Sequence, residues 1–268
     1  MGGINNIMCG IAFIVNYNEK LDIPIDVIEQ VFKNISKRGT DASGYYFERI
    51  DDGKKITRLI KGPYTTSVLW KIVHTQNKDK EKEKFYSNFR INGKEKLILL
   101  HARAMTHGSE YNNQNNMPIR SQDYVLIHNG VISNQRDATY HYRGEVDSEE
   151  ILAKIAKEGL EKGVASVCGS MSIVLKPVAS PNIFLYRNTN PLEIVYFMKE
   201  KLLIGASDAE YIPISEIQSA FSQNLFTPLI TITSPIPHYL YSIDIEKPKV
   251  KCVAKISNIA TGEFHAFN

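Results

Sequence analysis

Short apolar runs rich in β-branched and aromatic residues recur along almost the whole chain and indicate a fold with many strands. The early runs are CGIAFIVNY (9–17), YYFERI (45–50), KLILLHAR (96–103) and DYVLIHNG (123–130). Later runs lie at 170–176, 182–187, 192–199, 201–207, 229–233, 238–245 and 249–256. Runs of this length and composition are typical of buried strands.

Few segments between these runs have the spacing of an amphipathic helix. They are residues 23–36, 65–76, 147–163 and 207–221. In the first, Ile28, Val31 and Ile35 lie at helical spacing, and Pro24 stands near the start, where proline is tolerated. We expect a turn at 38–44, a solvated loop or helix end at 77–84 and a long polar loop at 104–122. Many strands with few helices predict a single α+β domain with stacked sheets.

Composition narrows the function classes. The 268 residues are 43% hydrophobic and 23% charged, as in ordinary globular proteins, and the net charge of +3 does not indicate nucleic-acid binding. Three widely spaced cysteines suggest neither a disulfide framework nor a metal site, so a reducing compartment is expected. No apolar stretch reaches the roughly 18–20 residues of a membrane span. Residues 1–8 lack the features of a secretory signal. We therefore predict a cytoplasmic protein with no metal, cofactor, nucleic-acid or membrane partner.

Cys9 allows two interpretations. A cysteine at the head of an apolar run is commonly a buried, inert side chain. If the chain instead begins at Cys9, its free α-amine, with a pKa of about 8, can act as the base for its own thiol. That chemistry requires a cut between Met8 and Cys9. Residues 1–8 would then be a leader, or translation would begin at Met8, with removal of the initiator methionine.

The run HARAMTHG (101–108) ends a strand with an arginine. The planar guanidinium of Arg103 suits a carboxylate, although the residue alone favours a surface ion pair. Thr106 and His107 are compatible with a simple turn, and a lone histidine is more often structural than catalytic.

Two further motifs each have a structural and a functional interpretation. Asn129–Gly130 is a strong signal for a hairpin turn, but an Asn side-chain amide and a Gly backbone N–H can also form an oxyanion hole. Asp147 with Glu150 fits a capping box for the following helix, which the sequence alone favours. The alternative is that the Asp147 carboxylate binds a substrate ammonium group.

Taken in order, MCGI (8–11), RGTDASG (38–44), HARAMTHG (101–108), HNGVISN (128–134) and VDSEEI (146–151) resemble the glutaminase domain of class II glutamine amidotransferases. These are N-terminal-nucleophile hydrolases, and the greatest resemblance is to the glutaminase half of glucosamine-phosphate synthase. The likeness extends from residue 9 to about residue 244. It implies a four-layer αββα sandwich with the terminal cysteine at the mouth of a pocket between two sheets.

The resemblance also implies roles for individual residues. Cys9 would attack the side-chain amide of L-glutamine, and Asn129 and Gly130 would hold the oxyanion. Arg103 would bind the glutamine α-carboxylate, with Thr106 and His107 lining that end of the pocket, and Asp147 would bind the α-ammonium. Arg38 and Asp41 would help to order the loop around the nucleophile.

The sequence departs from the family pattern in three places. Cys9 is not the first encoded residue, and Ala104 stands where relatives often carry a large aromatic side chain. Residues 9–268 are expected to form one glutaminase-type domain without the acceptor domain that relatives carry. We therefore expect a stand-alone glutaminase subunit that supplies ammonia to a separate synthase or transferase. The alternative is a catalytically silent glutamine-binding or structural subunit that keeps residues 1–8; a third hypothesis keeps the fold but changes the substrate to another amide.

Overall fold

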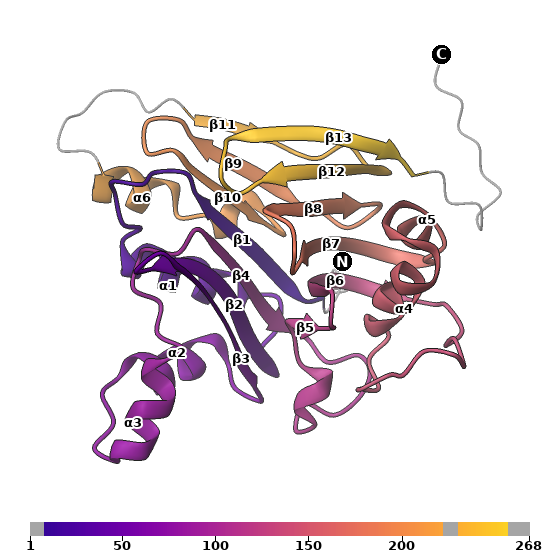
Figure 1. Ribbon diagram of the computed structural model, residues 1–268, viewed down its shortest axis with the longest axis horizontal. Coiled ribbons are helices and arrows are strands. Elements are labelled where there is room, and N and C mark those ends of the chain that lie inside the picture. The colour runs from indigo at the N-terminus through magenta and orange to yellow at the C-terminus, as the bar shows by residue number, and fades with distance from the viewer. Residues whose placement is uncertain (1–7, 222–229, 257–268) are drawn as a thin grey trace, which may run out of the picture.

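The structure is a computed structural model that describes residues 8–221 and 230–256. Two antiparallel sheets dominate it (Figure 1). The first sheet has the order β11 (Ile230–Thr233), β9 (Glu193–Phe197), β10 (Leu202–Ala206), β1 (Gly10–Asn16), β4 (Leu97–Arg103), β2 (Ala42–Asp51), β3 (Lys54–Gly62). The second has the order β13 (Lys249–Lys255), β12 (Tyr239–Asp244), β8 (Asn182–Arg187), β7 (Gly169–Pro177), β6 (Tyr124–Ile132), β5 (Ile119–Arg120).

Helices cover the outer faces of both sheets. They are α1 (Ile25–Ile35), α2 (Thr66–His74), α3 (Lys80–Ser87), α4 (Glu149–Glu158), α5 (Leu160–Ala165) and α6 (Ile214–Phe221), with short 3₁₀ turns η1 (Asn113–Asn115) and η2 (Ala209–Tyr211). Apolar side chains of α1 and α2 pack on the first sheet, and those of α4 and α5 pack on the second. A third apolar cluster lies between the sheets. The four-layer αββα sandwich expected from the resemblance is therefore confirmed.

Alternation along the central strands explains this layering. Ile11, Phe13 and Val15 of β1 belong to the core between the sheets, whereas Ala12 and Ile14 belong to the core under α1 and α2. Successive side chains of a strand point to opposite faces, so a strand buried on both sides reads as a continuous apolar run. The uninterrupted GIAFIVN segment is therefore explained by burial on both faces.

The structure corrects several of the element boundaries expected from the sequence. The helix expected at 147–163 is broken at Gly159 into α4 and α5, and β2 already begins at Ala42 inside the expected turn. The charged run 77–84 contains the start of α3. Strand β3 and the short β5 were not among the expected strands. No helix in the described residues is both long and apolar enough to span a bilayer.

Candidate active site

The start of β1 and the end of β4 bring Cys9 and Arg103 to one end of the first sheet. Gly10 pairs with Ala102, so the residues that follow this pair outward are Cys9 and Arg103. On the other side of β4, Ala42 pairs with Arg103, and the Asp41 backbone N–H donates to the Arg103 carbonyl at 3.0 Å. Strand register thus holds the nucleophile candidate, Cys9, and the carboxylate-binding candidate, Arg103, at the same end of the first sheet.

Strand β6 of the second sheet contributes Asn129 to the same space. Val125 and Ile127 of β6 and Leu97 and Leu99 of β4 all belong to the core between the sheets. Continuing the two-residue alternation places Asn129, Arg103 and Cys9 on the inner faces as well. His101 of β4 contacts β6 next to Asn129, because its Nε2 lies 3.2 Å from the His128 carbonyl oxygen.

The Cys9 thiol is protonated at neutral pH in this form of the chain. Its Sγ donates to the Ala104 carbonyl oxygen at 3.6 Å. Burial raises the pKa of Cys9 to about 11, and the charge of Asp147 adds to this, while the charges of Arg103 and Arg38 act in the opposite direction. A partly buried thiol with such a pKa needs a base before it becomes a nucleophile.

Arg103 already holds the loop that follows β4. Its Nη2 donates to the carbonyl oxygens of His107 at 2.5 Å and Gly108 at 2.8 Å, and its Nη1 donates to Asn116 Oδ1 at 2.9 Å. The surface ion pair that the sequence allowed is not formed with any described carboxylate. Arg103 is 4% exposed, so its charge acts within the site.

Asn129 and Gly130 lie inside β6, and the hairpin interpretation is wrong. The Asn129 side chain is fully buried, and neither its Oδ1 nor its Nδ2 has a hydrogen-bond partner among the described residues. Gly130 has φ of +148°, and a Cβ at this position would lie 1.9 Å from the Ser170 carbonyl oxygen. The backbone therefore requires glycine directly beside an unused amide group.

Asp147 does not cap α4, so the favoured capping-box interpretation is also wrong. The N-cap position is Ser148, and no side chain caps the helix there. One Asp147 oxygen instead accepts from the Ile132 backbone N–H at 2.6 Å. Glu150 interacts with Tyr142 and Lys154 rather than with the helix start. Asp147 thus lies beside the end of β6, and its charge acts on both Cys9 and Arg103.

The remaining candidates surround this group. The Asp41 carboxylate accepts from the Met105 backbone N–H at 2.7 Å, and the Arg38 side chain interacts with Tyr211. Both residues therefore lie in contacts that shape the loops next to Cys9. Thr106 and His107 are exposed, and His107 Nδ1 lies 3.3 Å from Thr106 Oγ1. Their place on the loop held by Arg103 is compatible with a pocket wall.

Three buried polar residues that the sequence did not single out support the site. Asn190 donates to the Asn129 carbonyl oxygen at 2.7 Å, Asn116 accepts from Arg103, and His128 Nδ1 lies 2.8 Å from Ser148 Oγ. Their partners are remote in sequence. Asn116 and Asn190 lie in polar stretches and carry no local signal of a role in the site. His128, by contrast, stands in the HNG motif.

Within the described residues, no group of three or more His, Cys, Asp or Glu side chains is arranged to hold a metal ion. What the arrangement offers is a thiol, an unused amide, the Arg103 cation and the Asp147 anion at one end of the two sheets. These groups fit attack on a carbonyl carbon and recognition of a small zwitterion.

Neither the family models nor the curated proteins give a match to this chain. Solved structures do. The allosteric regulatory enzyme of purine biosynthesis matches with a TM-score of 0.61 and 16% identity over 91% of this chain and 49% of that one. The glutamine phosphoribosylpyrophosphate amidotransferase from B. subtilis matches with a TM-score of 0.57 and 16% identity, with the same coverage. A glutamine aminotransferase class-II domain protein from Silicibacter pomeroyi matches with a TM-score of 0.50 and 11% identity over 93% of this chain and 100% of that one.

This chain spans about half the length of the first two structures, and identities this low establish the fold only. The chain therefore has the fold of the class II glutamine amidotransferases, the αββα sandwich of the N-terminal-nucleophile hydrolase type.

Proposed function

We propose that this chain hydrolyses L-glutamine to glutamate and ammonia once Cys9 is its first residue. The observation that carries the proposal is the Asn129 amide, which is fully buried without a hydrogen-bond partner among the described residues. An unsatisfied buried polar group costs about 1–3 kcal/mol, so its presence points to a ligand or an intermediate that satisfies it. The fold and the inner-face position of Cys9 support the same conclusion.

The reaction begins when the Cys9 α-amine takes the thiol proton and Sγ forms a bond to the glutamine amide carbon. The resulting oxyanion accepts hydrogen bonds from Asn129 Nδ2 and the Gly130 N–H. Collapse breaks the carbon–nitrogen bond, and ammonia leaves with the proton held by the amine. Water then adds to the thioester, its proton passes to the amine, and glutamate departs as the thiol regains a proton. The net reaction consumes one glutamine and one water.

Recognition of glutamine rests on the two charges of its α-carbon. Arg103 binds the carboxylate and Asp147 binds the ammonium, while Thr106 and His107 line the carboxylate end. Both hydrogens of Arg103 Nη2 are engaged by His107 and Gly108, so a two-pronged carboxylate contact displaces at least one of these carbonyls. Amides without these charges are bound more weakly than glutamine, because the buried partners would remain unpaired.

We further propose that the released ammonia passes to a separate synthase or transferase in the cytoplasm. The B. subtilis enzyme, whose name couples glutamine to phosphoribosylpyrophosphate, supports an acceptor in general and leaves its chemistry here undefined. Co-purification from the native source, followed by glutamate-release assays with and without the captured enzyme, tests the coupling. Stimulation by that enzyme supports it, and a glutaminase rate that no co-purified protein changes argues against it.

A second candidate function is favoured by the peptide bond between Met8 and Cys9. While it is intact, the Cys9 nitrogen is an amide rather than an amine, and the raised thiol pKa keeps Sγ protonated. In that state the chain would be a silent glutamine-binding or structural subunit. Intact mass of the natural protein separates the candidates: a start at Cys9 supports the enzyme, and retention of residues 1–8 supports the silent subunit.

Substitution of Arg103 by alanine tests the substrate class. For glutamine, Arg103→Ala raises KM strongly with a smaller change in kcat, because the carboxylate contact is present throughout the reaction. If the variant hydrolyses its best amide substrate normally, that substrate is not glutamine.

A further inference from the structure

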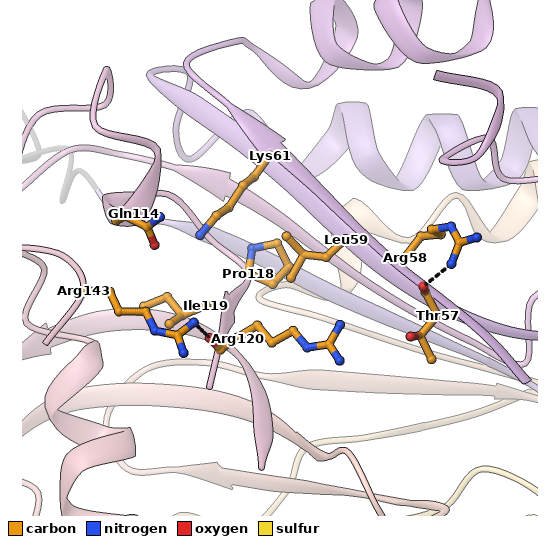
Figure 2. Close-up of a pocket in the computed structure, with 9 residues that line it drawn as sticks. All are labelled: Thr57, Arg58, Leu59, Lys61, Gln114, Pro118, Ile119, Arg120 and Arg143. Atoms are coloured by element: carbon orange, nitrogen blue, oxygen red, sulfur yellow. Dashed lines mark hydrogen bonds between the residues drawn. The ribbon is translucent and has the colours of Figure 1, made fainter. Parts of the chain in front are cut away.

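A cationic cavity lies where the edges of the two sheets approach each other. It adjoins the candidate active site, because its Lys61 donates to the Asn116 carbonyl oxygen and the Asn116 side chain accepts from Arg103. Its volume is about 410 Å³, and it is lined by Thr57, Arg58, Leu59, Lys61, Gln114, Pro118, Ile119, Arg120 and Arg143 (Figure 2). Edge strand β3 supplies one wall, edge strand β5 and the segment before it supply another, and Arg143 comes from the loop before α4. None of the candidate catalytic or glutamine-binding residues lines it.

The four basic residues of this cavity have no carboxylate partner. No lining residue is acidic, and none of Arg58, Lys61, Arg120 and Arg143 forms an ion pair with a described residue. The charge of Glu149 acts on Lys61, but the Glu149 carboxylate already accepts from the backbone N–H groups of Arg143 and Gly144. Like charges gathered without an ion-paired carboxylate repel one another and concentrate anions from solution. Edge strands often carry single lysines that prevent pairing, but that role does not require basic residues from three segments around one cavity.

The hydrogen-bond donors of these side chains are largely unused. Lys61 Nζ donates to the Asn116 carbonyl oxygen at 2.6 Å, and Arg143 Nη1 donates to the Arg120 carbonyl oxygen at 2.9 Å. The Arg120 side chain donates no hydrogen bond to another described residue, and Arg58 reaches only the carbonyl of Thr57. Figure 2 shows the charged ends of Lys61 and Arg143 on one side of Leu59, Pro118 and Ile119, and the Arg120 guanidinium on the other side, toward Thr57. A ligand shared by all three therefore requires the exposed Arg120 side chain to rotate.

We propose that this cavity binds a small organic phosphate, with the phosphate held by Lys61, Arg120 and Arg143 and its apolar or aromatic body on Leu59, Pro118 and Ile119. Arginine and lysine are the side chains that bind phosphate most strongly, and the volume lies within the range of small-molecule sites. A concave site with an apolar floor favours a small ligand over an acidic protein segment, which needs a longer surface.

The test measures binding of naphthyl phosphate to the whole chain by calorimetry. Naphthyl phosphate is expected to bind with a Kd of about 1 mM or tighter, and inorganic phosphate and naphthol, which each lack one half of the ligand, more weakly. Arg120→Gln is expected to weaken binding about tenfold without loss of thermal stability, because Arg120 is exposed and unbonded. Lys61→Gln is expected to weaken the binding of naphthyl phosphate as well, and so provides a second, independent variant. Lys82→Gln on α3 removes one exposed positive charge elsewhere and leaves the Kd unchanged.

Three results would overturn the proposal. Equal Kd values for the wild type and Arg120→Gln would show diffuse attraction to positive charge. Binding of inorganic phosphate or naphthol as tight as that of naphthyl phosphate would contradict the assignment to an organic phosphate. Tighter binding of polyglutamate than of naphthyl phosphate would identify a protein-docking surface. None of these readouts depends on glutaminase activity, so this proposal and the proposed function fail separately.

Discussion

The Asp147 carboxylate accepts a hydrogen bond from the Ile132 backbone N–H at 2.6 Å, which fixes it to the strand that carries Asn129 and Gly130. Asp147 comes from the turn before α4, so this contact joins the outer helical layer to the end of β6. The proposed ammonium-binding group and the proposed oxyanion-binding groups therefore keep a fixed separation. A rigid separation of this kind is what a site needs when it binds one end of glutamine and reacts with the other.

Substitution of Asp147 tests this arrangement. Asp147→Asn keeps an oxygen that can accept from Ile132 but removes the negative charge, so KM for glutamine is expected to rise about tenfold or more. Glutaramate, which lacks the α-ammonium, provides the control substrate. Its KM is expected to be equal in the variant and the wild type. An equal loss for both substrates would show that Asp147 acts only as a structural residue.

Asn129→Ala is expected to separate activity from stability. Loss of an oxyanion-hole donor lowers kcat by about 10²–10³-fold, with little change in KM. The melting temperature is expected to stay near that of the wild type, because the Asn129 amide has no described partner to lose.

Asn188→Ala is the matched control for that variant. Asn188 is also buried, but it accepts from the Met171 N–H at 2.7 Å and donates to the Gly169 carbonyl at 2.7 Å. Its removal is expected to cost about 1–3 kcal/mol of unfolding free energy by leaving these groups unpaired. If Asn129→Ala loses as much stability and keeps its kcat, Asn129 is a structural residue.

The reactivity of Cys9 is expected to change with the state of its nitrogen. In a chain that retains Met8, alkylation of Cys9 by iodoacetamide stays slow at neutral pH and increases toward pH 11, because burial raises the thiol pKa to about 11. In a chain that starts at Cys9, the amine takes up the thiol proton, and the midpoint moves toward the amine pKa of about 8. Peptide mass spectrometry measures the extent of Cys9 alkylation in both chains at each pH. Exposed Cys252 serves as the internal reference for the reagent. Identical profiles for the two chains would contradict the role of the amine.

Two buried histidines are expected to make the fold acid-sensitive. Burial lowers the pKa of His101 to about 3 and that of His128 to about 4, and the charge of Asp147 partly offsets the latter. Each therefore binds fewer protons in the folded chain than in the unfolded chain below a pH of about 6.5. The unfolding free energy accordingly falls as the pH drops from about 6.5 toward 3, by up to about 1.4 kcal/mol per pH unit for each histidine.

Denaturant titrations at several pH values check this expectation. His101→Gln removes one titrating group, so the pH dependence is expected to become shallower between about pH 6.5 and 3. A slope as steep as that of the wild type would show that His101 does not contribute.

The strands of the sandwich core could be predicted from the sequence because their signal is local. The apolar runs that became β1, β4 and β6 show β-branched and aromatic enrichment directly. Edge strand β3 lacks this signal, since charged residues interrupt its apolar residues without regular alternation and it is mostly only partly buried. The Asp52–Gly53 pair between β2 and β3, both with positive φ, was the hairpin signal that could have located it.

The site was harder to predict from the sequence, because its contacts join residues that are remote in sequence. Asn129–Gly130 carries a hairpin signal that the neighbouring strand β7 overrides, and Asp147 lies where a helix cap is expected but bonds to Ile132 instead. The residues allowed both functional interpretations, but the ordered resemblance of five motifs was what favoured them. Local propensity alone would have assigned these residues to a turn and a cap.

The most direct test compares glutamate release by two forms of the chain, one beginning at Cys9 and one retaining residues 1–8, each verified by intact mass. The form that begins at Cys9 is expected to release glutamate from glutamine, and its Cys9→Ala variant is expected to be inactive. The form that retains residues 1–8 is expected to show no release above that variant. Equal rates from the two forms would contradict the account, because they would show that no free amine on Cys9 is needed.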